Sequence, residues 1–247
     1  LACALATWQP DLFIDTHTSN GSDYQHTLTL IESQVDKLGG PLEGFVRDTL
    51  TPWFYTRLDT AGWATVPYVI TKPGVDIPDS GLVAFLETPR YSTGFAALVG
   101  IPGYVVETQM LKPFPDRMRS TLSFLRLAVN ALAEQGETLA ARRRQWFAHW
   151  QRAAYAPFGW QVDWHRADTI TFHGYTATYA PGPVTGLPLR HFNHAQPWTS
   201  RIPYWNHYTA TDSTPIPTGY ILPQAWGRVT ERDRKSTRLN SSHANIS

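Results

Sequence analysis

The chain has 247 residues, of which 42% are hydrophobic and 17% are charged. This composition is typical of a globular protein and excludes disordered, collagen-like and membrane-spanning chains, because no apolar run is long enough to cross a bilayer. The formal net charge of +1 falls to −2 when the residues from Arg234 onward are set aside, because they hold three basic residues and no acid. The sequence therefore has no basic patch that would indicate a nucleic-acid partner. A single cysteine, Cys3, excludes an internal disulfide framework and a cysteine-based zinc site.

The first eight residues resemble the last turns of a helix, with Leu5 and Trp8 on its buried side. They include no initiating Met, no basic segment and no apolar stretch long enough for a signal peptide. We therefore expect the chain to begin inside a domain.

The segment Pro10–Gln25 reads PDLFIDTHTSNGSDYQ and predicts a buried strand that ends in a polar loop. Side chains two apart on a strand share a face, so Asp15 and His17 lie together. A carboxylate beside an imidazole fixes its tautomer, as in many histidines that bind a metal. The alternative is a hydrogen-bonded histidine with a structural role.

Apolar spacing predicts a helix over residues 41–57, followed by a strand and a loop rich in Pro and Gly. A further strand from Leu82 reaches Glu87 and Thr88, and a loop with Arg90 and Tyr91 follows. A guanidinium is suited to a carboxylate because it presents a planar fork of donors. The alternative is an ordinary surface loop.

The segment Gly103–Phe114 predicts a second buried strand, and Glu107 lies at or near its end. Burial would raise the pKa of this carboxyl toward neutrality, as a general base requires. The alternative is a structural salt bridge from Glu107 to Lys112 or Arg117.

These motifs, FIDTH with its polar loop, then PRYSTGF, then VVETQMLKPF, together resemble the zinc metallocarboxypeptidases of the carboxypeptidase A type. The resemblance implies an α/β fold in which residues 1–135 are the C-terminal half of a mixed-sheet peptidase domain. It also implies a Zn²⁺ cofactor, a peptide substrate and a secreted or periplasmic parent protein. His17 matches the third zinc ligand and Glu107 the catalytic glutamate; Arg90 and Tyr91 fall in the substrate-side loop, and Asp15 would orient His17.

The chain departs from the family because the upstream His-x-x-Glu motif and the later Asn-Arg pair do not precede His17. A catalytic zinc site needs three protein ligands, so we expect this chain to be inactive and its parent to be active. Five histidines of a later region form no replacement motif: His165, His173, His191, His194 and His207. A zinc deacylase of N-acyl amino acids on the same scaffold is an alternative reaction.

Residues 136–232 are expected to form a helical linker and a small accessory β-domain, a sandwich or a barrel. Apolar spacing predicts one helix over residues 118–135 and another from Glu137 to about Tyr155. The density of aromatic residues after Ala156 allows another function, a carbohydrate- or peptide-binding module. Residues 233–247 have no apolar pattern and resemble a non-native tail derived from a sequencing adapter.

Overall fold

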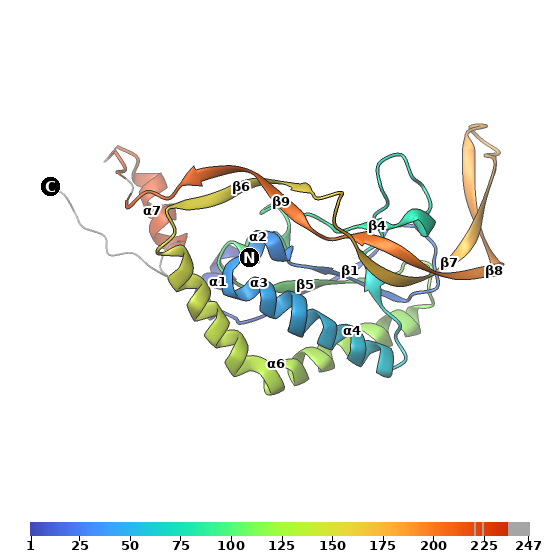
Figure 1. Ribbon diagram of the computed structural model, residues 1–247, viewed down its shortest axis with the longest axis horizontal. Helices are drawn as coiled ribbons and strands as arrows, with labels where there is room; N and C mark the ends of the chain where they lie inside the picture. Colours follow the sequence, from blue (N-terminus) through green and yellow to red (C-terminus); the bar gives the residue numbers. More distant parts are fainter. Residues whose placement is uncertain (220, 224, 237–247) are drawn as a thin grey trace.

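The computed structural model describes residues 1–219, 221–223 and 225–236, and it has a mixed α/β fold (Figure 1). The helical segments are α1 Ala2–Trp8, α2 Val35–Leu38, α3 Gly40–Phe45, the π-helical η1 Val46–Leu50, α4 Thr51–Thr60, the 3₁₀ segment η2 Pro78–Ser80, α5 Ser92–Ala97, α6 Phe114–Trp150 and α7 Gly227–Ser236. The strands are β1 Phe13–Thr18, β2 Leu28–Glu32, β3 Val66–Pro67, β4 Leu82–Val83, β5 Gly103–Thr108, β6 Tyr155–Val162, β7 Asp168–Pro181, β8 Pro188–Trp205 and β9 Tyr208–Pro215.

The central sheet has four strands in the order β1-β5-β2-β3. β1 is parallel to β5, whereas β2 is antiparallel to β5 and parallel to β3. Both strands predicted around the candidate site are present, and they are direct neighbours. The sheet is mixed, as the resemblance implied for this half of the chain.

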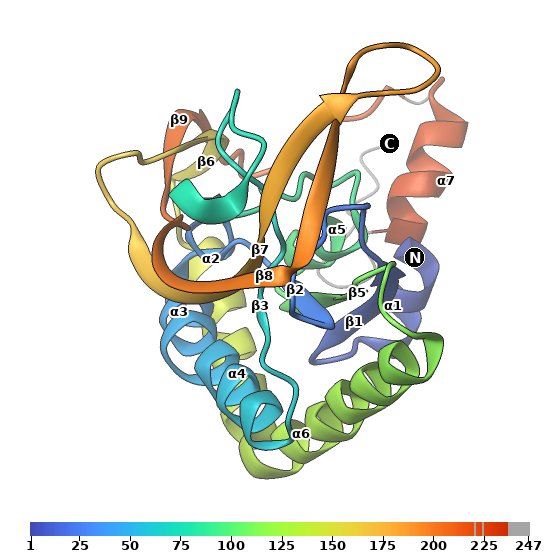
Figure 2. The same ribbon diagram turned by 90° about the vertical axis from the view of Figure 1, so that its right-hand side faces the viewer.

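Helices α3, α4 and α6 cover one face of this sheet (Figure 2). Their core contains Phe54, which stacks on Phe124 of α6 with ring centroids 4.8 Å apart and meets Tyr104 of β5 at 4.9 Å. α1 and α5 lie on the opposite face, where Leu5 and Ala96 form a smaller cluster with Ile101. The sheet is therefore packed between two helical layers.

The helix expected over residues 41–57 is present, but it is divided into α3, η1 and α4. Pro52 lies at the start of α4. Because proline has no N–H to donate, the preceding turn widens to the π-helical η1 and the helix continues.

The two helices predicted after residue 114 are a single helix, α6, of 37 residues. It runs through Gly136 and across residues 135–136, where the two parts of the chain were expected to meet. A glycine inside a helix costs about 1 kcal/mol. Burial of Leu139 and Trp146, which pack on the same core as Phe124, offsets that cost.

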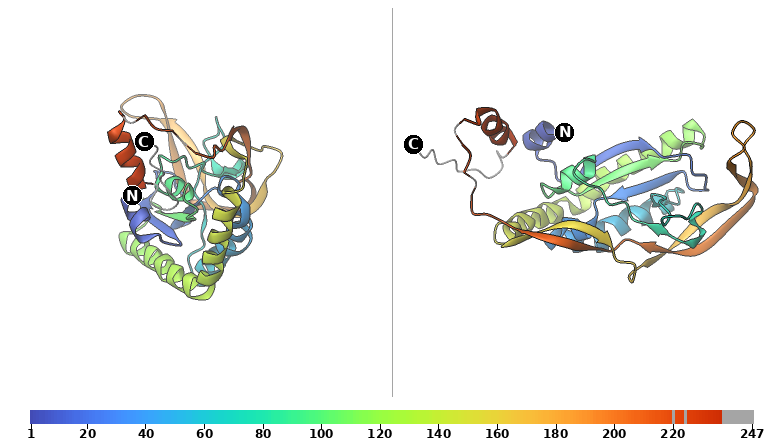
Figure 3. Two further views of the ribbon diagram at one scale, coloured as in Figure 1. Left: turned by 90° about the vertical axis from the view of Figure 1, so that its left-hand side faces the viewer. Right: turned by 90° about the horizontal axis from the view of Figure 1, so that it is seen from above.

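The four strands β6–β9 form one long antiparallel ribbon that runs along one side of the molecule (Figure 3, right). β6 pairs with β9 and β7 with β8, and β4 extends the β7–β8 pair. This arrangement differs from the sandwich or barrel that was expected. The reason is that the ribbon buries Phe172 and Ile202 against Tyr24 and Leu82 from the first half of the chain, and has no second sheet to face.

The ends of the chain differ in part from expectation. In α1, Leu5 is buried as predicted, but Trp8 is 81% exposed and not on a buried side. The proposed non-native tail, residues 233–247, begins inside α7, and residues 237–247 lie outside the described part of the chain. Within the described residues, every helix is too short or too polar to span a bilayer.

Candidate functional site

The ends of β1 and β5 bring the two predicted chemical groups together. In the parallel register His17 is opposite Glu107, and Asp15 is opposite Val105. Residues 13, 15 and 17 share one face of β1, and residues 103, 105 and 107 continue that face on β5. This is the face away from α6, because Tyr104 and Val106 point into the core below.

Asp15 contacts His17 directly, as the spacing of the two residues predicted. Its Oδ1 lies 3.1 Å from His17 Nε2. Its other oxygen, Oδ2, accepts a hydrogen bond of 2.5 Å from the hydroxyl of Ser92, the first residue of α5. The carboxylate therefore has a fixed orientation, whereas the His17 side chain is 52% exposed and open to solvent.

Glu107 is 8% exposed, although it stands at the end of its strand. Burial raises the pKa of its carboxyl above the ordinary value of 4.5; His17 nearby lowers it and Asp15 raises it. The alternative of a structural ion pair is not supported within the described residues, where neither Lys112 nor Arg117 pairs with Glu107. A buried carboxyl with a raised pKa is suited to accepting and returning a proton.

Arg90 and Tyr91 lie on the loop that leads into α5, and both are exposed. Tyr91 packs its ring edge-on against Phe85 at a centroid distance of 4.8 Å. The next residue, Ser92, makes the bond to Asp15, so the loop is attached to the middle of β1. The sequence indicated Ser92 only as a loop residue, because Asp15 lies 77 residues earlier in the chain and no local pattern marks a contact over that separation.

The residues present do not make a complete zinc site. Among the described residues no group of three His, Cys, Asp or Glu side chains could hold a metal ion. His26, which precedes β2 at the same end of the sheet, is engaged with the carbonyl of Ala64 and the N–H of His173, and Asp15 is engaged with Ser92. Of the later histidines, His194 pairs with Asp23 at 2.6 Å and His207 lies 3.7 Å from Asp168.

A groove of about 760 Å³ lies elsewhere, between α4 and β7. It is lined by Glu32 and Asp168 among other residues, but not by His17 or Glu107. Burial raises the pKa of Glu32 to about 7, with a smaller contribution from Glu87. The sequence does not single out Glu32, because the pattern of residues around an acid at a strand end does not indicate that the acid is buried.

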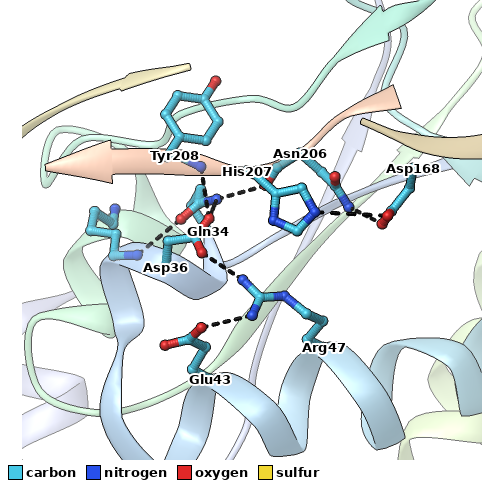
Figure 4. A network of polar contacts seen from close by, with 9 residues as sticks. Gln34, Asp36, Glu43, Arg47, Asp168, Asn206, His207 and Tyr208 are labelled. Atoms are coloured by element: carbon cyan, nitrogen blue, oxygen red, sulfur yellow. Dashed lines mark hydrogen bonds and ion pairs between the residues drawn. The ribbon is translucent and has the colours of Figure 1, made fainter. Parts of the chain in front are cut away.

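A polar network fixes the ribbon to the first helices (Figure 4). Asp36 accepts hydrogen bonds from Arg47 at 2.6 Å and from the backbone N–H of Tyr208 at 2.8 Å. Gln34 donates to Asp36 at 2.9 Å and to the carbonyl of Asn206 at 3.0 Å. Each of these groups has a partner within the fold, so we interpret the network as structural.

The comparisons with known proteins leave this chain without an assigned family. No protein-family model, no curated protein and no solved structure matches it.

Proposed function

We propose that this chain is the part of a carboxypeptidase A-type zinc metallopeptidase that carries the third zinc ligand, His17, and the catalytic glutamate, Glu107. The observation that carries the proposal is the register of β1 and β5, which sets these two residues opposite each other on one face of the sheet. The reaction of the parent protein would be hydrolysis of C-terminal peptide bonds.

The immediate surroundings of the two residues support these roles. Asp15 lies 3.1 Å from His17 Nε2 and, held by Ser92, limits the rotation of the imidazole ring. Glu107 is shielded from water and its pKa is raised by burial, so it would exchange protons near neutral pH more readily than an exposed glutamate. Arg90 and Tyr91, on the loop attached through Ser92, would bind the substrate.

The ligand set of this chain by itself is insufficient, because His17 is one donor where tight zinc binding takes three. We therefore expect the isolated chain to be inactive and to bind zinc weakly. Its parent would supply the remaining ligands.

The test is to recover the coding sequence upstream of Leu1 and to produce the longer protein. Zinc content by elemental analysis and release of C-terminal residues from peptides are the two measurements. We expect bound zinc and exopeptidase activity. Glu107→Gln should keep the zinc and lower kcat at least about 100-fold, whereas His17→Ala should lose the zinc.

Glu137→Gln, on the exposed side of α6, is the matched control and should change neither quantity. Full activity of Glu107→Gln, or absence of both zinc and activity in the longer protein, would contradict the proposal. Activity on N-acyl amino acids without release from peptides would instead support the deacylase alternative.

A further inference from the structure

The groove of about 760 Å³ lies between α4 and β7, beside β3. β3 is the strand at the opposite end of the sheet order from β1, and the groove is lined by neither His17 nor Glu107. Sites for small ligands commonly have volumes of about 300–1,000 Å³. The groove is therefore large enough to hold a ligand, and it is separate from the candidate site described above.

β7 presents an open strand edge to this groove. It pairs with β8 on one side, and within the described residues no strand pairs with its other side. The N–H and C=O of His173 point to that open side, because they bond to His26 Nε2 and to the N–H of Gln25. In an antiparallel pair this direction repeats every second residue, so the backbone groups of Thr171 and Thr169 face the same side. Both residues line the groove, and an extended peptide could pair with them.

Two buried acceptor atoms of groove residues have no hydrogen-bond partner among the described residues, namely Oε2 of Glu32 and Oδ1 of Asn206. The amide of Asn206 has a fixed orientation, because its Nδ2 donates a hydrogen bond of 2.6 Å to Asp168 Oδ2 (Figure 4). A carboxylate and an amide oxygen can only accept hydrogen bonds. The ligand group that would complement both atoms is therefore a donor with several N–H bonds.

The charges around the groove favour a cation. Its walls carry three carboxyl groups, from Glu32, Asp59 and Asp168, against one guanidinium, from Arg201. Burial raises the pKa of Glu32 to about 7, and an ammonium group beside it would favour the charged carboxylate. A lysine side chain fits this environment, because it carries three donors and a compact charge on a flexible stem that can reach a recessed acceptor.

We propose that this groove binds an extended peptide segment that carries a lysine. The segment would pair with the outward backbone groups of Thr169 and Thr171, and its ammonium group would donate to Glu32 and Asn206. Backbone pairing would supply affinity for many sequences, whereas the lysine would supply specificity. The inference is independent of the proposed function, because binding in this groove requires neither zinc nor catalysis.

The first test is a direct measurement of binding by fluorescence anisotropy. The probe is the nonapeptide Ser-Thr-Val-Thr-Lys-Thr-Val-Thr-Ser, with fluorescein at its N-terminus and an amidated C-terminus. A matched probe has norleucine in place of the lysine, which keeps the apolar stem and removes the charge. We expect the lysine probe to bind at least about tenfold more tightly than the norleucine probe, because the latter leaves a buried carboxylate unpaired.

A variant of the groove locates the lysine contact. Glu32→Gln should weaken binding of the lysine probe at least about tenfold and leave binding of the norleucine probe unchanged, because it removes the charge and keeps the shape. Asp48→Asn, at an exposed aspartate of η1 outside the groove, is the matched control and should alter neither dissociation constant. Circular dichroism of both variants should match that of the parent chain.

Strand pairing is tested by hydrogen exchange. The amides of Thr169 and Thr171 should exchange more slowly with the lysine probe bound, and a lysine probe with alternate backbone nitrogens methylated should bind at least about tenfold more weakly. Absence of binding, or equal affinity for the lysine and norleucine probes, would overturn the proposal. Binding without protection of β7, or equally tight binding of N-acetyl-lysine amide, would show that the groove takes a small amine and would overturn it equally.

Discussion

β1 and β5 are adjacent strands of equal length, yet their surroundings are opposite. All six residues of β5 are buried, whereas none of the six residues of β1 is. β5 has a strand on each side and α6 beneath it, whereas within the described residues β1 pairs with β5 alone. The candidate site joins these two environments, because its histidine comes from the open strand and its glutamate from the enclosed one.

This difference explains the properties of the two site residues. Enclosure removes water from Glu107, and burial raises the pKa of its carboxyl. Openness leaves the His17 ring accessible to a ligand. A strand pair with one enclosed and one open member can therefore hold a buried acid and an exposed imidazole side by side. Three predictions test the contacts that enclose β5, the neighbouring strand β2 and the ribbon.

The largest effect is expected from the helix that covers β5. Phe124 is fully buried against Tyr104, and replacing it by alanine should lower the free energy of unfolding by about 3–5 kcal/mol through loss of burial and a residual cavity. Phe114, on the same helix, is 64% exposed, and Phe114→Ala should cost less than about 1 kcal/mol. Urea denaturation of both variants measures the difference. Equal losses would show that the two sides of α6 are packed alike.

The next effect concerns His26, which precedes β2 on the enclosed side of the sheet. Its Nδ1 lies 2.9 Å from the carbonyl of Ala64, and its Nε2 accepts a hydrogen bond from the backbone N–H of His173. Burial lowers the pKa of His26 from 6.5 to about 4. The neutral ring fits both contacts, since protonation would place a second donor against the His173 N–H.

Because the pKa of His26 is lower in the folded state, the unfolded chain binds more protons between pH 6.5 and pH 4. Its contribution to stability is therefore complete above about pH 6.5 and is lost as the pH falls toward 4, by roughly 3 kcal/mol. His26→Gln should remove that part of the pH dependence, measured by urea denaturation from pH 4 to 8. His165→Gln, at an exposed histidine, should retain it. An unchanged pH profile in His26→Gln would be inconsistent with a buried neutral ring.

The smallest effect is expected where the ribbon is fixed to α2 (Figure 4). Asp36→Ala removes the acceptor of Arg47, Gln34 and the Tyr208 N–H, and it should lower the free energy of unfolding by about 2 kcal/mol. Asp48→Ala, at an exposed aspartate of η1, should stay within about 0.5 kcal/mol of the parent chain. Faster hydrogen exchange of the β9 amides in Asp36→Ala would show that the lost stability comes from the attachment of the ribbon. Unchanged exchange in β9 would contradict an anchoring role for Asp36.

Local pattern predicted the elements that carry the site. Apolar runs ending in polar residues located β1 and β5, and alternation placed Asp15 beside His17. Helical spacing also found the segment over residues 41–57. These features depend on residues close together in the chain, so the sequence contains enough information to place them.

The features that local pattern did not predict depend on packing between segments far apart in the chain. The single helix α6 continues through Gly136 because distant residues bury its second half, and Trp8 is exposed although helical spacing placed it inside. The ribbon pairs residues of the last third of the chain and packs Phe172 on Tyr24, a contact between segments almost 150 residues apart. Aromatic density and alternating runs had suggested a separate sandwich or barrel there.

The sequence by itself determined which residues could do chemistry: a histidine and a glutamate, each at the end of an apolar strand. Only the tertiary structure decided that the two strands are parallel neighbours in a register that sets His17 opposite Glu107, and that Ser92 holds Asp15. The physical reason is that strand order and register depend on contacts between segments about 90 residues apart, whose free energy no local pattern records.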